Sequence, residues 1–493
     1  SNDLQRSFLF QRLTKFPSRT IKCHGYLLYI IRSLPKFLFD INAVFMKNQI
    51  MTITNPPLQH VALLGAGGKM GRGIALLLLQ EYALCAAEKK QSFQLSLIDT
   101  NNELLRSLPS YLRTHLKKYT ERMIEPLRTF YAEVPSLVSN KEIIDTFLTQ
   151  ALDSVRYSTS IEEARDASLI FEAIIENVAI KSDVLKKVAK IAAPTAFFFT
   201  NTSSIPIDHL EEKSELEGRL IGFHFYNPPP IQQLIEIIPS LKTSPELLNF
   251  ATTLAGRLKK TAIFSAPIAG FIGNGHFIRE LHYACTLATE LAEERPLYEA
   301  LYIVNTVTQD LLVRPMGIFQ LADYVGLDVC DSIASIMDPA LTSPLITKML
   351  DQGMRGGQHP DGSQRPGFFT YNGHTPTGIY DETTKETWAY NEGDWSTHCR
   401  TTIGPIPADT PTWKSLQKSK VPLEILLPYF SELFISNTKG AQLSKNFIAH
   451  SQSIAHSLVK QKVAKNLDDI TTVLKLGFYH LYGPTEINMG SSS

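Results

Sequence analysis

A glycine-rich turn between two apolar runs constrains the fold of this chain more than any other feature of its sequence. Residues 60–64 form a short apolar run typical of a buried parallel strand, and residues 74–79 continue as an apolar helix. The glycines of such a turn let backbone amides approach a pyrophosphate, which binds at the N-terminus of the helix. The sequence therefore predicts a dinucleotide site. Its predicted contacts are Gly65, Gly67, Gly68, Met70 and Gly71.

A second predicted strand, over residues 93–98, ends at an acidic residue, Asp99. A carboxylate at that place accepts hydrogen bonds from the ribose hydroxyls of NAD and repels the 2′-phosphate of NADP. The glycine turn is one residue longer than the usual fingerprint, and residues 81–91 are expected to be an insertion before the second strand. The sequence predicts NAD as the cofactor, and a tight turn that binds no ligand is the alternative.

Strands and helices continue to alternate farther along the chain. Residues 168–175 and 196–201 are predicted strands, and a lysine-rich helix over residues 181–190 lies between them. This alternation predicts a parallel sheet with helices on both faces. Ligands bind at the carboxyl ends of parallel strands. Four residues follow such strand ends and are expected to lie at one edge of the sheet: Gly65, Asp99, Glu176 and Ser203.

One histidine and one glutamate stand out in the next two predicted strands. His224 lies within residues 220–226, and Glu236 lies in an apolar run over residues 234–238. A proline-rich turn over residues 228–230 is expected to bring the strands side by side, so that the buried carboxylate pairs with the imidazole. A histidine held by a carboxylate can act as a general base beside a dinucleotide. The alternatives are a histidine satisfied within the core and a glutamate that faces solvent.

Several stretches of the chain, in the same order, resemble the NAD-dependent 3-hydroxyacyl-CoA dehydrogenase family. They are residues 65–75, 172–181, 201–204, 224–229, 234–238, 270–274, 314–317 and 321–327. The resemblance implies a Rossmann-type domain and NAD as the cofactor. It also implies the interconversion of 3-hydroxyacyl-CoA and 3-ketoacyl-CoA, in fatty-acid β-oxidation or related acyl-CoA metabolism.

The resemblance further implies a role for each matching residue. His224 would take the proton of the substrate's 3-hydroxyl as C3 passes a hydride to the nicotinamide, and Glu236 would orient the imidazole. Ser203 and Asn274 would hydrogen-bond the 3-oxygen or the thioester. The positions that match cofactor contacts, besides the glycine turn, are Asp99, Glu176, Lys181 and Ser203.

The sequence departs from the family pattern at three places. Residues 267–270 read Pro-Ile-Ala-Gly, Gly275 follows Asn274 where the family has arginine, and Asp331 replaces a family lysine. These changes concern acyl-CoA affinity and chain-length preference. Two other functions stay open, namely a dehydrogenase of another 3-hydroxy acid and a non-catalytic NAD-binding sensor or structural protein.

The predicted fold is α/β, with a Rossmann-type doubly wound sheet followed by all-α C-terminal domains, the second a partial repeat of the first. Residues 304–317 and 470–483 align without a gap, which predicts a dimer or a pseudo-dimeric monomer through the helical domains. The second copy is expected to be structural. The predicted parts are an N-terminal extension (1–58), the NAD-binding domain (59–266), a first helical domain (267–340), a glycine- and aromatic-rich insertion (341–410) and a second helical domain (411–493).

The insertion allows two interpretations. Glycines and aromatic residues alternate between residues 346 and 400. An ordinary surface β-excursion is the favoured interpretation, and a flap near the acyl site is the alternative.

Composition and cysteine usage exclude other classes of protein. Lys and Arg number 48 and Asp and Glu number 48, so the chain has no net charge that would attract nucleic acid. Five scattered cysteines without a C-x-x-C pair argue against a disulfide framework and a metal site, and they fit a reducing compartment. No stretch reaches the roughly eighteen apolar residues that a membrane span needs. We expect an acyl-CoA as the partner, with no metal and no nucleic acid.

The beginning of the chain is basic and poor in acids, with Asp40 as the one acid between Arg6 and Lys47. Such a segment resembles an organellar transit peptide. A true start at Met46 or Met51, or an amphipathic arm, is favoured over targeting. The expected compartment is the cytoplasm, or the mitochondrial matrix if residues 1–50 are a transit peptide.

Overall fold

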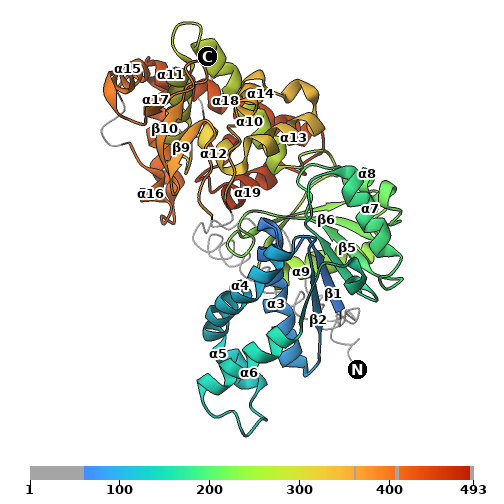
Figure 1. Cartoon of the computed structure of the whole chain (residues 1–493). Helices are drawn as coiled ribbons and strands as arrows, with labels where there is room; N and C mark the ends of the chain where they lie inside the picture. Colours follow the sequence, from blue (N-terminus) through green and yellow to red (C-terminus); the bar gives the residue numbers. More distant parts are fainter. Residues whose placement is uncertain (1–59, 360–361, 406–409, 489–493) are drawn as a thin grey trace, which may run out of the picture. The chain divides into compact units, whose positions relative to one another are not determined.

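The computed structural model describes residues 60–359, 362–405 and 410–488 (Figure 1). The predicted N-terminal extension lies outside the described residues. The described chain begins with an α/β part and continues into a helical part, in the order expected for the predicted fold class. The predicted domain boundaries stay a prediction.

An eight-stranded sheet forms the centre of the α/β part, in the order β3-β2-β1-β4-β5-β6-β7-β8. The strands from β1 to β6 pair in parallel, β7 runs antiparallel to β6, and β8 is parallel to β7. Their bounds are β1 (His60–Leu64), β2 (Gln94–Ile98), β3 (Val155–Ser158), β4 (Leu169–Glu172), β5 (Phe197–Thr200), β6 (Leu220–Phe225), β7 (Leu234–Pro239) and β8 (Thr261–Phe264).

Helices cover both faces of this sheet because its strands bury alternate side chains on opposite faces. Val61 and Leu63 of β1 pack in the same apolar cluster as α3, α4, α6 and α9. Ala62 and Leu64 pack in a second cluster with α7 and α8. The helices are α3 (Lys69–Lys89), α4 (Asn102–Arg122), α5 (Ile124–Phe130), α6 (Asn140–Asp153), α7 (Val178–Ala189), α8 (Ile207–Ser214) and α9 (Pro245–Arg257), and a 3-10 turn, η1 (Ile161–Ala164), precedes β4.

One predicted strand boundary is wrong, and the predicted insertion takes a definite form. The strand predicted over residues 168–175 ends at Glu172, because the carboxylate of Glu172 accepts the amide of Ile174 and turns the backbone away from the ladder. The residues predicted as an insertion, 81–91, mostly lengthen a helix, since α3 continues to Lys89. Tyr82 and Ala83 are buried in the core, which explains why the helix continues there.

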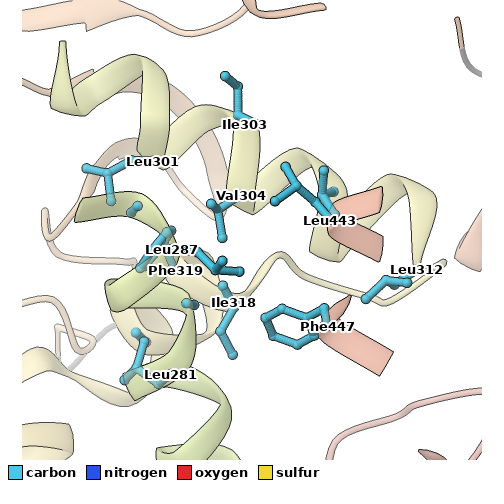
Figure 2. Close-up of a cluster of buried hydrophobic side chains, with 14 of the residues drawn as sticks. Leu281, Leu287, Leu301, Ile303, Val304, Leu312, Ile318, Phe319, Leu443 and Phe447 are labelled. Atoms are coloured by element: carbon cyan, nitrogen blue, oxygen red, sulfur yellow. The ribbon is translucent and has the colours of Figure 1, made fainter. Parts of the chain in front are cut away.

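The helical part begins with α10 and shares one large apolar core. Leu281, Val304 and Phe319 of its first half pack in the same core as Leu443 and Phe447 of α18 (Figure 2). The elements before the insertion are α10 (Gly273–Leu291), α11 (Leu297–Thr306), a π-helical turn η2 (Val307–Leu311), α12 (Ile318–Val325), α13 (Leu327–Met337), η3 (Pro339–Leu341) and α14 (Pro344–Asp351).

The later elements include a small antiparallel sheet, in the order β11-β10-β9. Its Trp388 stacks on Tyr298 of α11, with ring centroids 4.9 Å apart. The elements are β9 (Phe369–Asn372), β10 (Thr375–Tyr380), β11 (Thr387–Ala389), α15 (Gly393–Ile403), α16 (Trp413–Leu416), α17 (Pro422–Ile435), α18 (Lys439–Lys460), α19 (Leu467–Gly477) and η4 (Pro484–Glu486).

The two passages that repeat in the sequence adopt the same local structure. Gly317 precedes α12 and its amide donates to Gln320 Oε1 over 2.9 Å, while Gly483 precedes η4 and its amide donates to Glu486 Oε2 over 2.7 Å. When this gapless alignment is extended toward the N-terminus, the first residue of α10 aligns with the first residue of α18. These two helices pack against each other. The alignment also pairs two residues with positive φ, Val313 (50°) and Tyr479 (58°).

Candidate active site

His224 and Glu236 lie directly opposite each other on the antiparallel strands β6 and β7. Nδ1 of His224 lies 3.5 Å from Oε1 of Glu236, which is an ion-pair distance but not a formed hydrogen bond. Glu236 is 0% exposed and His224 is 7% exposed. The two residues that the sequence singled out are therefore brought together as predicted.

The carboxylate of Glu236 is held by neutral donors. It accepts the hydroxyl of Tyr226 over 2.6 Å and the backbone amides of Ile272 and Gly273 over 2.9 and 3.3 Å. Burial, together with the neighbouring Glu236, raises the pKa of Tyr226 well above its usual value, so this phenol stays a donor. The sequence analysis missed Tyr226, although it stands two residues after His224 and strand alternation places it on the same face.

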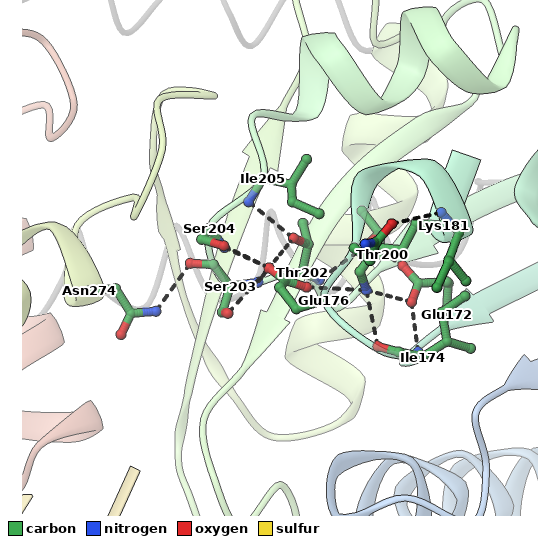
Figure 3. Close-up of polar contacts among 12 residues, drawn as sticks. Glu172, Ile174, Glu176, Lys181, Thr200, Thr202, Ser203, Ser204, Ile205 and Asn274 are labelled. Carbon is green, nitrogen blue, oxygen red and sulfur yellow. Dashed lines mark hydrogen bonds and ion pairs between the residues drawn. The ribbon is translucent and has the colours of Figure 1, made fainter. Parts of the chain in front are cut away.

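Ser203 and Asn274 approach each other from different parts of the fold (Figure 3). Asn274 lies in the first turn of α10, and its Nδ2 donates to the carbonyl oxygen of Ser203 over 3.1 Å. Ser203 follows β5, and its amide donates to Glu176 Oε1 over 2.9 Å. Both residues line the same cavity as His224.

A buried charge network lies behind Ser203 (Figure 3). Glu176 accepts donors from residues 202–204 and pairs with Lys181, whose Nζ lies 3.3 Å from Oε2. Burial alone would raise the pKa of Glu176, but Lys181 and the hydroxyl donors hold it below its usual value. Lys181 is 1% exposed and also pairs with Glu172 over 2.6 Å. Its ammonium thus supports Glu176 and is not among the lining groups of the cavity.

The glycine turn leads from β1 into α3 as the sequence predicts. Gly65 has a φ of +79°, and a Cβ on Gly71 would lie 1.9 Å from the carbonyl oxygen of Gly65, so both positions require glycine. Gly68 begins α3 without a side-chain cap, which leaves the first amides of the helix available to an anion. Asp99, directly after β2, accepts the amide of Gly67 over 2.9 Å. These residues fit the pyrophosphate and ribose of a dinucleotide.

Met70, Glu176, Ser203, His224 and Asn274 meet at a cavity of about 490 Å³, whereas Asp99 and the glycines of the turn are not among its lining residues. The α/β part contributes Met70, Glu176, Ser203 and His224, and the first helical copy contributes Asn274, Met316 and Tyr324. The second copy contributes Gly477, Phe478 and Tyr479. The second copy was expected to be structural, but these residues form part of the cavity wall. No sequence pattern signalled them, because the contact depends on the packing of α19 beside β7.

The insertion lies nearer the site than the favoured interpretation predicted. Tyr371 and His374 of the small sheet line a second cavity, which shares Pro228, Met316 and Tyr324 with the first. This geometry favours the flap interpretation over an ordinary surface excursion. The aromatic residues of the stretch did signal a packed element, since Trp388, Trp395 and Tyr390 contact α11.

The described residues lack two further features. They contain no cluster of His, Cys, Asp or Glu side chains suited to a metal ion. Among the same residues, no helix has the length and apolarity to cross a membrane. Four cysteines of the described chain, Cys85, Cys285, Cys330 and Cys399, are unpaired.

Comparison with known protein families gives two adjoining matches. Residues 60–266 match the NAD binding domain of 3-hydroxyacyl-CoA dehydrogenase, and residues 270–371 match the C-terminal domain of the same family.

Two curated relatives are similar over most of their own length. A probable 3-hydroxybutyryl-CoA dehydrogenase of Deinococcus radiodurans is 32% identical over 217 residues, which are 43% of this chain and 76% of that protein. The mitochondrial hydroxyacyl-coenzyme A dehydrogenase of Sus scrofa is 30% identical over 275 residues, which are 55% of this chain and 77% of that protein.

A solved structure shares the fold over a longer stretch. The 3-hydroxybutyryl-CoA dehydrogenase of Escherichia coli K12 superposes with a TM-score of 0.56 at 18% identity. The match covers 87% of this chain and 90% of that one. At this identity the likeness is one of fold.

Proposed function

Because the chain belongs to the 3-hydroxyacyl-CoA dehydrogenase family, we propose that it interconverts 3-hydroxyacyl-CoA and 3-ketoacyl-CoA with His224 as the general base. It is an NAD-dependent dehydrogenase, and NAD is its cofactor. The observation that carries the proposal is the placement of His224 opposite Glu236, at a cavity that Ser203 and Asn274 also line.

The proposed proton transfer uses the imidazole of His224. NAD, when bound, supplies a nicotinamide that accepts the hydride from C3 of the substrate. His224 takes the proton of the 3-hydroxyl, and Glu236 stabilises the resulting imidazolium through the 3.5 Å contact. Since Glu236 has no arginine or lysine partner among the described residues, its charge is available to the imidazole. In the reductive direction, His224 returns the proton to the 3-oxygen.

Ser203 and Asn274 are proposed to hold the substrate. The hydroxyl of Ser203 and the amide of Asn274 line the cavity beside His224, where they can donate to the 3-oxygen or the thioester. For the cofactor, we propose the glycine turn (Gly65, Gly67, Gly68, Met70 and Gly71) as the pyrophosphate site and Asp99 as the ribose acceptor. Glu176 and Ser203 would contact the cofactor directly, and Lys181 would act through Glu176.

NADH consumption tests the proposed function. Purified protein is mixed with NADH and acetoacetyl-CoA, with a longer 3-ketoacyl-CoA, or with free acetoacetate. Turnover that requires the CoA ester supports the dehydrogenase. Binding of NADH without turnover of either ester would contradict it and would favour a sensor, while turnover of free acetoacetate would favour another 3-hydroxy acid.

We also propose that the two helical copies make one pseudo-dimer within the chain. The packing of α10 against α18 and the hydrogen bond from Tyr482 to the carbonyl oxygen of Leu312 (2.7 Å) support it. Sedimentation should give a monomer at micromolar concentration. An obligate dimer formed through residues 276–330 would contradict the proposal.

The biological setting is part of the proposal as well. The unpaired cysteines fit a reducing compartment such as the cytoplasm. Fatty-acid β-oxidation or related acyl-CoA metabolism is the proposed context of the reaction.

A further inference from the structure

A second cavity adjoins the proposed active site. It has a volume of about 530 Å³ and shares Pro228, Met316 and Tyr324 with the cavity that contains His224. We call it the insertion pocket. Its other polar lining side chains include Gln320 of α12 and Gln358, Tyr371 and His374 of the insertion.

One buried carboxylate fixes the insertion at this place. Asp323 of α12 is 0% exposed and accepts the amides of Phe368 and Phe369 over 2.8 and 2.9 Å, and the hydroxyl of Tyr371 over 2.8 Å. Its backbone carbonyl accepts the side-chain amide of Gln364 over 2.6 Å. The small sheet is thus anchored to the helix that also lines the active site (Figure 1), so the wall of the insertion pocket is a fixed part of the fold.

The polar lining groups of the insertion pocket are side-chain amides, phenols and one imidazole. Gln320 is 8% exposed, and its Oε1 accepts the amide of Gly317 over 2.9 Å. Its Nε2 has no hydrogen bond within the described chain, so it is available to a group in the pocket. His374 adds an imidazole at the turn between β9 and β10. Among the described residues, the lining contains no Asp, Glu, Lys or Arg.

We propose that the insertion pocket binds a neutral hydroxyl or amide group of the acyl-CoA substrate, away from the reacting carbons. This inference rests on the proposed function. The amide of Gln320 can donate to such a group, and the amide of Gln358 and the imidazole of His374 can donate or accept. A carboxylate would meet no lysine or arginine among the described lining residues, which disfavours an acyl group that ends in an acid. The group can come from the pantetheine arm or from a hydroxylated acyl tail.

Matched substrates separate these two sources. One pair is 3-ketooctanoyl-CoA and its 8-hydroxy derivative, with the 8-carboxylate analogue as a third member. The other pair is acetoacetyl-pantetheine and the acetoacetyl thioester of ethanethiol, which lacks both pantetheine amides. The variants are Gln358→Leu, His374→Leu and Gln320→Glu, the last of which keeps an acceptor for Gly317 while losing the donor. His398→Leu is the control, because His398 is exposed within the insertion and lines neither cavity.

The expected result is a KM raised about tenfold in the variants, with kcat unchanged. A rise confined to the 8-hydroxy substrate assigns the pocket to the acyl tail. A rise for every CoA and pantetheine ester, but not for the ethanethiol ester, assigns it to pantetheine. KM values equal to those of His398→Leu, with normal turnover of acetoacetyl-CoA, would overturn the insertion pocket alone. A native protein that turns over no 3-ketoacyl-CoA would overturn the proposed function and this inference with it.

Discussion

Two buried histidine–glutamate pairs lie within the described residues, and their surroundings differ. In the first pair, His224 and Glu236 face each other across β6 and β7, and His224 lines the cavity. In the second pair, His276 and Glu280 lie one turn apart on α10, with Nδ1 and Oε1 4.0 Å apart. His276 is 0% exposed and lines none of the cavities described above.

The partner of the carboxylate separates the two pairs. Glu280 forms two hydrogen bonds of 2.9 Å with the guanidinium of Arg314. Burial would raise the pKa of Glu280, but Arg314 lowers it to about 2. Burial also lowers the pKa of His276, so this imidazole stays neutral. Because Arg314 already balances the charge of Glu280, this carboxylate stabilises an imidazolium only weakly. Glu236, in contrast, is held by neutral donors only.

Loss of the first histidine should give the largest effect. His224→Gln is expected to lower kcat for acetoacetyl-CoA reduction about 10²- to 10⁴-fold, which is the usual contribution of a general acid–base group. NADH binding, followed by fluorescence, should be unchanged. His276→Gln serves as the matched control and should leave kcat within about twofold. Equal losses in the two variants would remove the distinction between the pairs.

Loss of Arg314 should lower the stability of the folded chain and not its catalytic rate. Arg314→Met leaves Glu280 as an unbalanced buried charge, since the two side chains are 5% and 3% exposed. We expect a loss of about 3–5 kcal/mol in the free energy of unfolding by urea, with KM for NADH unchanged. The double variant that also carries Glu280→Met should recover most of the loss. No recovery would show that Arg314 acts mainly through its packing on Phe447.

Much of the first pair was predictable from sequence, and little of the second was. His224 and Glu236 lie in strands separated by one short turn, so strand alternation and the turn place them opposite each other. His276 and Glu280 lie four residues apart on one helix, a spacing that does not distinguish them from any other helical pair. Their surroundings come from Arg314, His480 and Ser451, which are distant in the sequence. Six of the eight strands were predicted because they are local apolar runs, whereas the short edge strands β3 and β8 were missed. The contribution of Gly477 to the cavity depends on long-range packing and was missed, and the flap near the acyl site was only the less favoured interpretation of the insertion.

The second helical copy contacts Tyr226, which hydrogen-bonds to the first pair, and one glycine tests this contact. A Cβ on Gly477 would lie 2.6 Å from Cε1 of Tyr226, the residue whose hydroxyl donates to Glu236. Gly477→Ala should therefore displace the phenol, cost about 1–3 kcal/mol of stability and lower kcat. Gly256→Ala is the control, because a Cβ there meets nothing within 4 Å. Unchanged kinetics in Gly477→Ala would show that the second copy only supports the fold.

The last expected effect is a pH dependence that arises from His276 of the second pair and from the neighbouring His480. Burial lowers the folded-state pKa of His276 and, well below its usual value, that of His480, from 6.5. Above pH 6.5 both residues are neutral in the folded and the unfolded chain, so they add no slope. Below it the unfolded chain binds protons that the folded chain does not, and stability falls as pH falls.

The slope can reach about 1.4 kcal/mol per pH unit for each histidine. Urea unfolding at about pH 7.5 and about pH 5.5 measures it, and comparison with His276→Gln/His480→Gln isolates the two residues from the other histidines. The double variant should show the flatter dependence. An equal slope in both proteins would mean that His276 and His480 take up protons in the folded chain despite Arg314. In that case the imidazoles of the two histidine–glutamate pairs would titrate more alike than their neighbouring residues indicate.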